Sequence, residues 1–141
     1  MENCQLCEIP EKESYRLIKE NNHAMACIIL EPITESHLLI LPKRHVVNLK
    51  ELQDQEAKEF LTLVYEMSEI LQQKFNTKGA ITSMNHGSSA SQSHIHFHTI
   101  ATDLSMRDAF AEKLNGPSRK RLAEEELTKL ANNIKAIITE R

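Results

Sequence analysis

The sequence predicts a single α+β domain, and three features support this fold class. Short runs rich in apolar and β-branched residues indicate antiparallel strands. Two longer segments carry apolar residues at spacings of three and four, which is typical of amphipathic helices. The length of 141 residues is usual for one domain, so residues 1–141 are treated as one unit.

The first three strands are expected in the N-terminal third of the chain. Residues 15–19 and 23–30 flank the turn-like pair Asn21-Asn22, which predicts a β-hairpin. A third strand at residues 37–41 follows a loop that contains a proline.

The remaining elements follow in alternation. Residues 52–75 predict a long amphipathic helix, and residues 80–84 predict a strand. A loop rich in serine at residues 85–93 leads into a strictly alternating strand at residues 94–100. A C-terminal helix is expected at about residues 118–139.

Composition narrows the function classes. Lys and Arg number 17 against 20 Asp and Glu, for a net charge of −3, so generic nucleic-acid binding is not expected. The longest apolar runs are far below the roughly 20 residues of a membrane helix, so no membrane segment is expected. Three cysteines are too few for a disulfide framework, which favours a reducing cytoplasm.

Three of the seven histidines stand at alternate positions. Side chains two apart in a strand share a face at about 6.6–6.8 Å, so His94, His96 and His98 project to the same side. The intervening Ile95 and Phe97 project to the other side, towards a core. Such a face is either a solvated polar surface that happens to be histidine, or a functional site.

Two chemistries fit three imidazoles on one face. Neutral histidine is the commonest metal ligand, so the three rings can hold a metal in a metal-dependent hydrolase. One ring can instead be a nucleophile towards phosphorus, with the others positioning it. A preceding loop of Ser, Asn and Gly that can donate hydrogen bonds to phosphate favours the second chemistry, but the residues alone leave both open.

Two stretches of the sequence resemble a known family. The segment His94-Ile-His-Phe-His-Thr-Ile100 resembles the signature of the histidine triad (HIT) superfamily. The upstream segment, in which His37 opens a strand that ends in Pro42-Lys-Arg-His45, is similar to the family's other recognisable stretch. The resemblance covers about residues 4–100.

The resemblance implies a fold and an activity. The fold is a five-stranded antiparallel sheet with two main helices, usually in a homodimer. The activity is hydrolysis or transfer at the α-phosphate of a nucleotide, such as a nucleoside phosphoramidate or a dinucleoside polyphosphate. It proceeds through a covalent nucleotidyl-histidine intermediate and requires no cofactor. The alternatives are the metal-dependent hydrolase and a non-catalytic nucleotide-binding protein.

The resemblance also assigns catalytic roles to four histidines. His96, the middle residue of the triad, would be the nucleophile. His98 would bind and orient the phosphate. His37 would lie behind His94 in a proton relay.

Substrate contacts follow from the same comparison, together with some departures from the family pattern. Asn85 would contact the phosphate or the leaving group, and Ser91 or Ser93 would replace the usual donor in a loop about two residues short. Ile29 stands where many members carry a ribose-binding residue, and Ser36 replaces the family glycine before the strand histidine.

A Cys-x-x-Cys pair lies at the N-terminus. The resemblance implies that Cys4 and Cys7 close a structural Cys2His2 zinc site with His45 and His94. In that case His94 would be structural, and His37 would have another partner. The alternative is that both cysteines are ordinary thiols of a frayed terminus.

Overall fold

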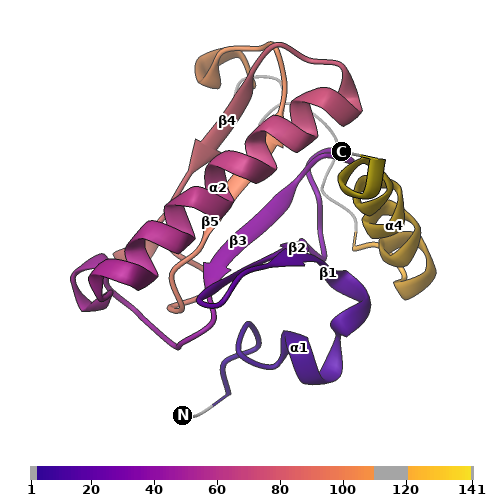
Figure 1. The fold of residues 1–141 in the computed structure, drawn as a ribbon. Helices are drawn as coiled ribbons and strands as arrows, with labels where there is room; N and C mark the ends of the chain where they lie inside the picture. Colours follow the sequence, from indigo (N-terminus) through magenta and orange to yellow (C-terminus); the bar gives the residue numbers. More distant parts are fainter. Residues whose placement is uncertain (1–2, 110–120, 141) are drawn as a thin grey trace.

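The structure is a computed structural model that describes residues 3–109 and 121–140 (Figure 1). Its centre is a five-stranded antiparallel sheet with the strand order β1-β2-β3-β5-β4. The α+β class and the five strands expected from the sequence are thereby confirmed. The strands are β1 (Leu17–Glu20), β2 (Ala24–Ile28), β3 (Leu38–Pro42), β4 (Ala80–Ser83) and β5 (Phe97–Ala101).

The β1–β2 hairpin forms where the sequence predicts it, because Asn21 closes its turn. The side-chain oxygen of Asn21 accepts hydrogen bonds from the main-chain amides of His23 and Ala24, at 3.0 and 2.8 Å. An asparagine that bonds the backbone two residues ahead is a standard turn device.

Helix α2 (Asp54–Phe75) covers one face of the sheet, in agreement with the predicted helix (Figure 1). At its start the amide of Gln53 donates to the carboxylate of Glu56 at 3.0 Å, which satisfies an amide that the helix itself leaves unpaired. The helix is followed by Asn76 in the left-handed conformation, at φ 53°. Its apolar face packs on the core through Phe60, Leu63, Met67 and Leu71.

Helix α4 (Glu124–Glu140) starts later than predicted. Residues 121–123 are not helical, and residues 118–120 lie outside the described part of the chain. Three acidic residues fill the first turn, where the helix dipole favours negative charge. The amide of Ala123 also donates to the carboxylate of Glu126 at 3.4 Å, which satisfies a main-chain amide at the start of the helix.

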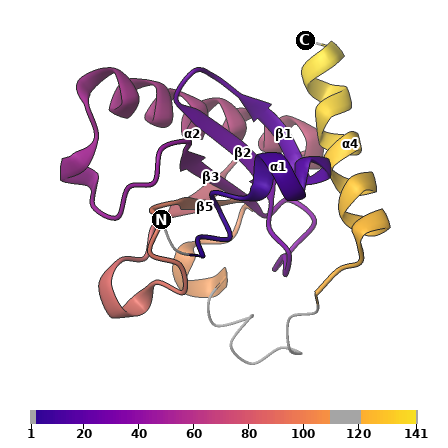
Figure 2. The ribbon, with the colours of Figure 1, turned by 90° about the horizontal axis from the view of Figure 1, so that it is seen from below.

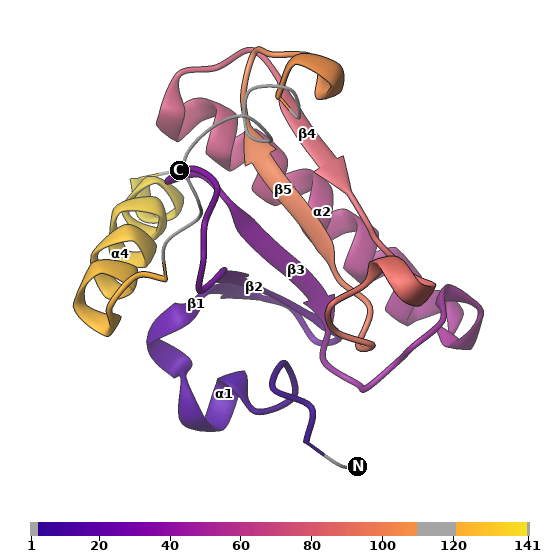
Figure 3. The same ribbon diagram turned by 180° about the vertical axis from the view of Figure 1, so that it is seen from behind.

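The opposite face of the sheet carries the N-terminal segment with the short helix α1 (Ile9–Lys12). In Figure 2 this segment lies in front of the sheet and α2 lies behind it, and in Figure 3 β5 passes in front of α2. Leu6 and Ile9 pack there against a second apolar cluster made by Met25, Cys27, Leu39 and Leu41. The segment that carries Leu6 and Ile9 is therefore held on the face opposite to α2.

The histidine-bearing strand is shorter than predicted. The sequence suggests a strand at residues 94–100, but β5 begins only at Phe97, so His94 and His96 precede it. The amide of Ile95 donates to the oxygen of Val46 at 2.8 Å, which ties this lead-in segment to the chain after β3. Within the described residues, no helix combines the length and apolar character of a membrane span.

Candidate functional site

His37 lies behind His98, not behind His94 as predicted. Nε2 of His37 is 2.9 Å from Nδ1 of His98. The register explains the difference: Leu38 pairs with Thr99, so the start of β3 meets the end of β5. His94 lies at the other end of β3, where its ring bonds the oxygen of Pro42.

The hydrogen bonds around His37 define which ring nitrogens carry hydrogen. The amide of Ile33 can only donate, and it lies 3.1 Å from Nδ1 of His37. Nδ1 of the neutral ring is therefore the acceptor, and the hydrogen is on Nε2, which donates to Nδ1 of His98. A neutral His98 then carries its own hydrogen on Nε2.

The same reasoning applies to His96. Nδ1 of His96 lies 2.8 Å from the main-chain oxygen of His94, which can only accept. The hydrogen of the neutral ring is thus on Nδ1, and Nε2 carries the lone pair. The rings of His96 and His98 lie next to each other, with 5.0 Å between centroids. The pair therefore places an imidazole with an available lone pair beside one that can donate a hydrogen.

His94 is turned away from this pair. Its Nε2 donates to the oxygen of Pro42 at 2.7 Å, so Nδ1 of the neutral ring carries the lone pair. Nδ1 faces the sulfur atoms of Cys4 and Cys7 at 3.4 and 3.3 Å. Burial lowers the pKa of His94, and the nearby His45 and His96 lower it further, so the ring is held in the neutral form that binds metals.

The two cysteines, His45 and His94 form one compact cluster. Nδ1 of His45 lies 3.4 Å from the sulfur of Cys7, and the four ligand atoms all lie within 4.8 Å of one another. Tetrahedral zinc with ordinary bond lengths separates sulfur and nitrogen ligands by about 3.6 Å. The bond from His94 to Pro42 is the kind of outer contact that orients a ligating imidazole. The residue types and spacings therefore fit zinc.

The two thiols lie side by side at the edge of the apolar cluster. The amide of Cys7 donates to the sulfur of Cys4 at 3.4 Å. Burial, followed by the contact with Cys4, raises the pKa of Cys7 to about 11. A divalent cation between the sulfurs would reverse this, because it favours the thiolate.

The loop before the triad carries the residues predicted to contact substrate. Asn85, Ser91 and Ser93 are all exposed in the segment between β4 and His94. Gln92 donates to Gln5 at 3.3 Å, so this loop touches the segment that bears the cysteines. The structure thus joins the loop, the triad and the cysteine pair, while the roles of the three loop residues remain predictions.

Two partners of the histidines were not identified from the sequence, and neither were the contacts of one nearby hydroxyl. The partners are the amide of Ile33 and the oxygen of Pro42. The hydroxyl is that of Ser36, which bonds both main-chain groups of Ala101. Both partners of the histidines are backbone atoms, which carry no signal in the sequence. Ser36, a polar residue directly before the histidine that opens the strand, is the one signal for these contacts that the sequence offers.

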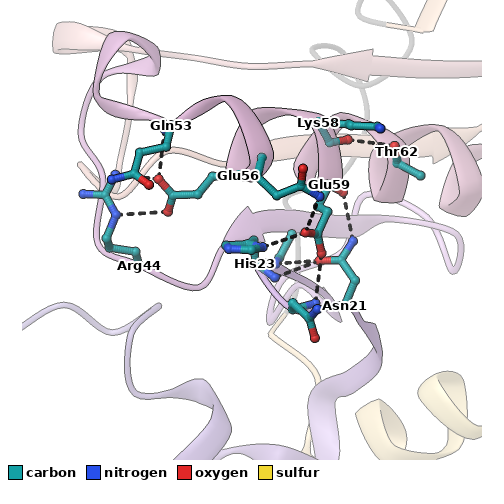
Figure 4. Close-up of polar contacts among 11 residues, drawn as sticks. Asn21, His23, Arg44, Gln53, Glu56, Lys58, Glu59 and Thr62 are labelled. Carbon is teal, nitrogen blue, oxygen red and sulfur yellow. Dashed lines mark hydrogen bonds and ion pairs between the residues drawn. The ribbon is translucent and has the colours of Figure 1, made fainter.

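Charged pairs outside the triad brace the fold. Arg44 contacts both carboxylate oxygens of Glu56 at 3.0 and 2.8 Å, and Nδ1 of His23 lies 2.7 Å from Glu59 (Figure 4). Hydrogen bonds from Arg44 and from Gln53 lower the pKa of Glu56 to about 2. These contacts fasten the β1–β2 turn and the segment after β3 to α2.

Comparisons with known proteins agree with this geometry. The profile of the HIT domain family matches residues 10–104. The adenosine 5'-monophosphoramidase HNT1 of Candida albicans is 31% identical over 106 residues, which cover 70% of this chain and 69% of that protein.

Solved structures give the same assignment. A hypothetical histidine triad nucleotide-binding protein from Sulfolobus tokodaii superposes with a TM-score of 0.77 at 26% identity, over 97% of this chain and 93% of that one. A Zn-bound histidine triad family protein from Mycobacterium smegmatis shares the fold, with a TM-score of 0.72 at 18% identity, over 98% and 96% of the two chains. A profile match over two thirds of the sequence, on a five-stranded fold that presents the histidine triad, shows that the chain belongs to the HIT family.

Proposed function

We propose that the protein is a nucleotide hydrolase or nucleotidyl transferase that acts at the α-phosphate through a covalent bond to His96. The observation that carries the proposal is the hydrogen bond from Nδ1 of His96 to the oxygen of His94, at 2.8 Å. It directs the lone pair of Nε2 away from the backbone. This lone pair is then available for attack on phosphorus without a strong base.

The reaction has two steps. Nε2 of His96 forms a bond to the α-phosphorus, and the bond to the leaving group breaks with its electron pair on that group, which takes up a proton from the solvent. Water, or an acceptor alcohol in a transferase, then displaces His96 from phosphorus and loses a proton. The Nε2–H group of His98 donates to a non-bridging oxygen and stabilises the charge that develops there.

The relatives support the choice of substrate class. HNT1 of Candida albicans is named as an adenosine 5'-monophosphoramidase, which cleaves a nucleoside phosphoramidate. We extend this class to the present chain and keep dinucleoside polyphosphates as the second substrate class. Asn85 and the hydroxyls of Ser91 and Ser93 are proposed to contact the phosphate or the leaving group, since they are exposed in the loop that leads into the triad.

The geometry weighs against a metal held by the triad itself. Among residues 3–109 and 121–140, the group of side chains that can hold a metal joins His94 to Cys4, Cys7 and His45, and includes neither His96 nor His98. Nδ1 of each of these two rings is bonded elsewhere, to the oxygen of His94 and to His37. This arrangement favours the covalent mechanism over the metal-dependent hydrolase.

A structural zinc at Cys4, Cys7, His45 and His94 is part of the proposal. Four protein ligands would leave no open position for substrate, so the metal would supply folding energy and take no part in catalysis. The zinc named for the relative from Mycobacterium smegmatis supports this proposal.

We also propose a homodimer located in the cytoplasm. Leu61 and Tyr65 are 55% and 69% exposed, one turn apart on α2, and the strand β4 forms an open edge of the sheet. Burying both in a second copy would remove apolar surface and an unpaired edge from water. The three free cysteines fit a reducing compartment.

The test is to trap the intermediate. The protein is mixed with a nucleoside phosphoramidate labelled at the α-phosphate, quenched rapidly and analysed by peptide mass spectrometry, with nucleotidyl-His96 as the expected adduct. His86→Ala, in the exposed loop, is the matched control and should label normally. Turnover that stops on exhaustive chelation and never gives an adduct would establish the metal-dependent alternative. Nucleotide binding without turnover would establish the non-catalytic one.

A further inference from the structure

We propose that Ser36 is a positioning residue that sets the orientation of the phosphate-binding ring of His98 by way of His37. The inference rests on the proposed function, because it assigns a role in the same reaction. Ser36 directly precedes His37 in the chain, and it is only 2% exposed. A hydroxyl buried at this position requires hydrogen-bond partners.

Ser36 extends the pairing between β3 and β5 beyond the end of β3. Continued by two residues beyond Leu38 and Thr99, the register would place Ser36 opposite Ala101. The side chain of Ser36 stands in for the main-chain bonds of that pair, since its oxygen accepts from the amide of Ala101 at 3.0 Å and donates to the oxygen of Ala101 at 3.3 Å. The chain that enters His37 is thus fixed to the end of the strand that carries His98.

The same hydroxyl holds the turn that orients the ring of His37. It lies 2.8 Å from the hydroxyl of Thr34, which also accepts from the amide of Ser36 at 3.2 Å. The amide of His37 donates to the oxygen of Thr34 at 3.1 Å and closes the turn. The neighbouring Ile33 then presents its amide to Nδ1 of His37 at 3.1 Å.

Removal of the Ser36 hydroxyl would therefore change the hydrogen bonding of His37 and, through it, of His98. The amide and the oxygen of Ala101 would lose a buried partner, which costs more than an exposed bond would. The turn would lose one of its two hydroxyls, and the bond from Ile33 that fixes the hydrogen of His37 on Nε2 would weaken. His98 would then receive a less directed hydrogen bond, although no atom of Ser36 touches the substrate.

The experiment compares Ser36→Ala, Ser36→Thr and the control Thr82→Ala. Thr82 bonds Thr99 at 3.3 Å from the β4 side, so its loss removes a hydroxyl contact to β5 without touching the turn. In ligand-free protein, the ring nitrogen shifts of His37 should show one tautomer in the wild type, in Thr82→Ala and in Ser36→Thr. They should show a mixture of tautomers in Ser36→Ala.

Kinetics give the second measurement. A small misplacement of an orienting group costs up to about 100-fold in rate, so kcat of Ser36→Ala should fall about 10- to 100-fold with little change in KM. Ser36→Thr, which keeps the hydroxyl, should recover most of kcat.

Each outcome decides the proposal. A wild-type tautomer and kcat in Ser36→Ala would overturn it. If that variant does not fold, Thr34→Val removes the second hydroxyl of the turn while keeping its shape, and an unchanged tautomer there would overturn it equally. The tautomer is measured without substrate, so a chain that turns over no nucleotide would contradict the proposed function and leave this test intact.

Discussion

The main-chain oxygen of His94 accepts a hydrogen bond from Nδ1 of His96, while the ring of the same His94 faces the cysteine pair. His94 thereby contacts His96 through its main-chain oxygen and the cysteine pair through its ring. The backbone of His94 is held independently of the cysteines, because its ring donates to Pro42 and the next amide donates to Val46. The orientation of His96 is therefore built into the fold.

The first prediction concerns the nucleophile. His96→Ala should lower kcat by about four orders of magnitude or more, because it removes the atom that bonds phosphorus. His98→Ala removes a donor to the phosphate and should cost about 100- to 1,000-fold. Steady-state kinetics on a nucleoside phosphoramidate measure both, and nucleotide binding should persist in each variant. Near-normal kcat in His96→Ala would show that the nucleophile lies elsewhere.

The second prediction concerns the metal. Elemental analysis of protein prepared without a histidine tag should give close to one zinc per chain, and Cys4→Ser/Cys7→Ser should lose it. The lost ligands should lower Tm by more than about 10 °C, since structural zinc supplies folding free energy directly. Below the lowered Tm, turnover should persist.

Cys27→Ala is the matched control for that experiment. Cys27 is the third cysteine, but it is fully buried in the apolar cluster and lies outside the metal group. This variant should keep its zinc. Wild-type protein that binds no zinc, or whose Tm does not respond to chelation, would make Cys4 and Cys7 ordinary thiols.

The third prediction concerns acid stability. The pKa of Glu56 is about 2 in the folded protein, below its usual value of 4.5, because Arg44 and Gln53 bond the carboxylate. Its stabilisation is complete above pH 4.5 and disappears as the pH falls towards 2. Glu56→Gln should therefore lower the unfolding free energy by about 1–2 kcal/mol at pH 7. As the pH falls towards 2 the two proteins should become equally stable.

Urea unfolding at several pH values measures this difference. Glu69→Gln, on the exposed face of the same helix, is the control and should unfold like the wild type throughout. A cost of Glu56→Gln that is equally large at the lowest pH would mean that the contact with Arg44 does not stabilise the fold through its charge.

The fourth prediction concerns assembly. Sedimentation at micromolar concentration should show a dimer, and Leu61→Asp should dissociate it, because a charge would be buried at the proposed interface. Thr62→Asp, one position further along the helix, is the control and should leave the dimer intact, unless any added charge on this helix dissociates it. A wild-type monomer of 16.1 kDa under the same conditions would contradict the dimer.

The sequence could predict the elements and the triad because both are periodic. Residues 52–75 repeat at helical spacing, and the result is α2. The alternation of residues 94–100 predicted a strand that is too long, because β5 begins only at Phe97. The alternating residues before it form a lead-in segment in which His94 contacts Cys7. The partner of His37 could not be predicted, since it depends on the register of β3 against β5, which the pattern of either strand alone does not define.

The hydrogen-bonded series Ile33 to His37 to His98 ends at a peptide amide, which does not give up its proton at neutral pH. A proton is therefore not passed along this series to a departing amine, nor back along it when water attacks. Both exchanges are then expected with water on the side of His96 and His98 that receives the substrate, as in the proposed reaction. A substrate whose leaving group covers that side should still be attacked by His96 but should release its amine slowly.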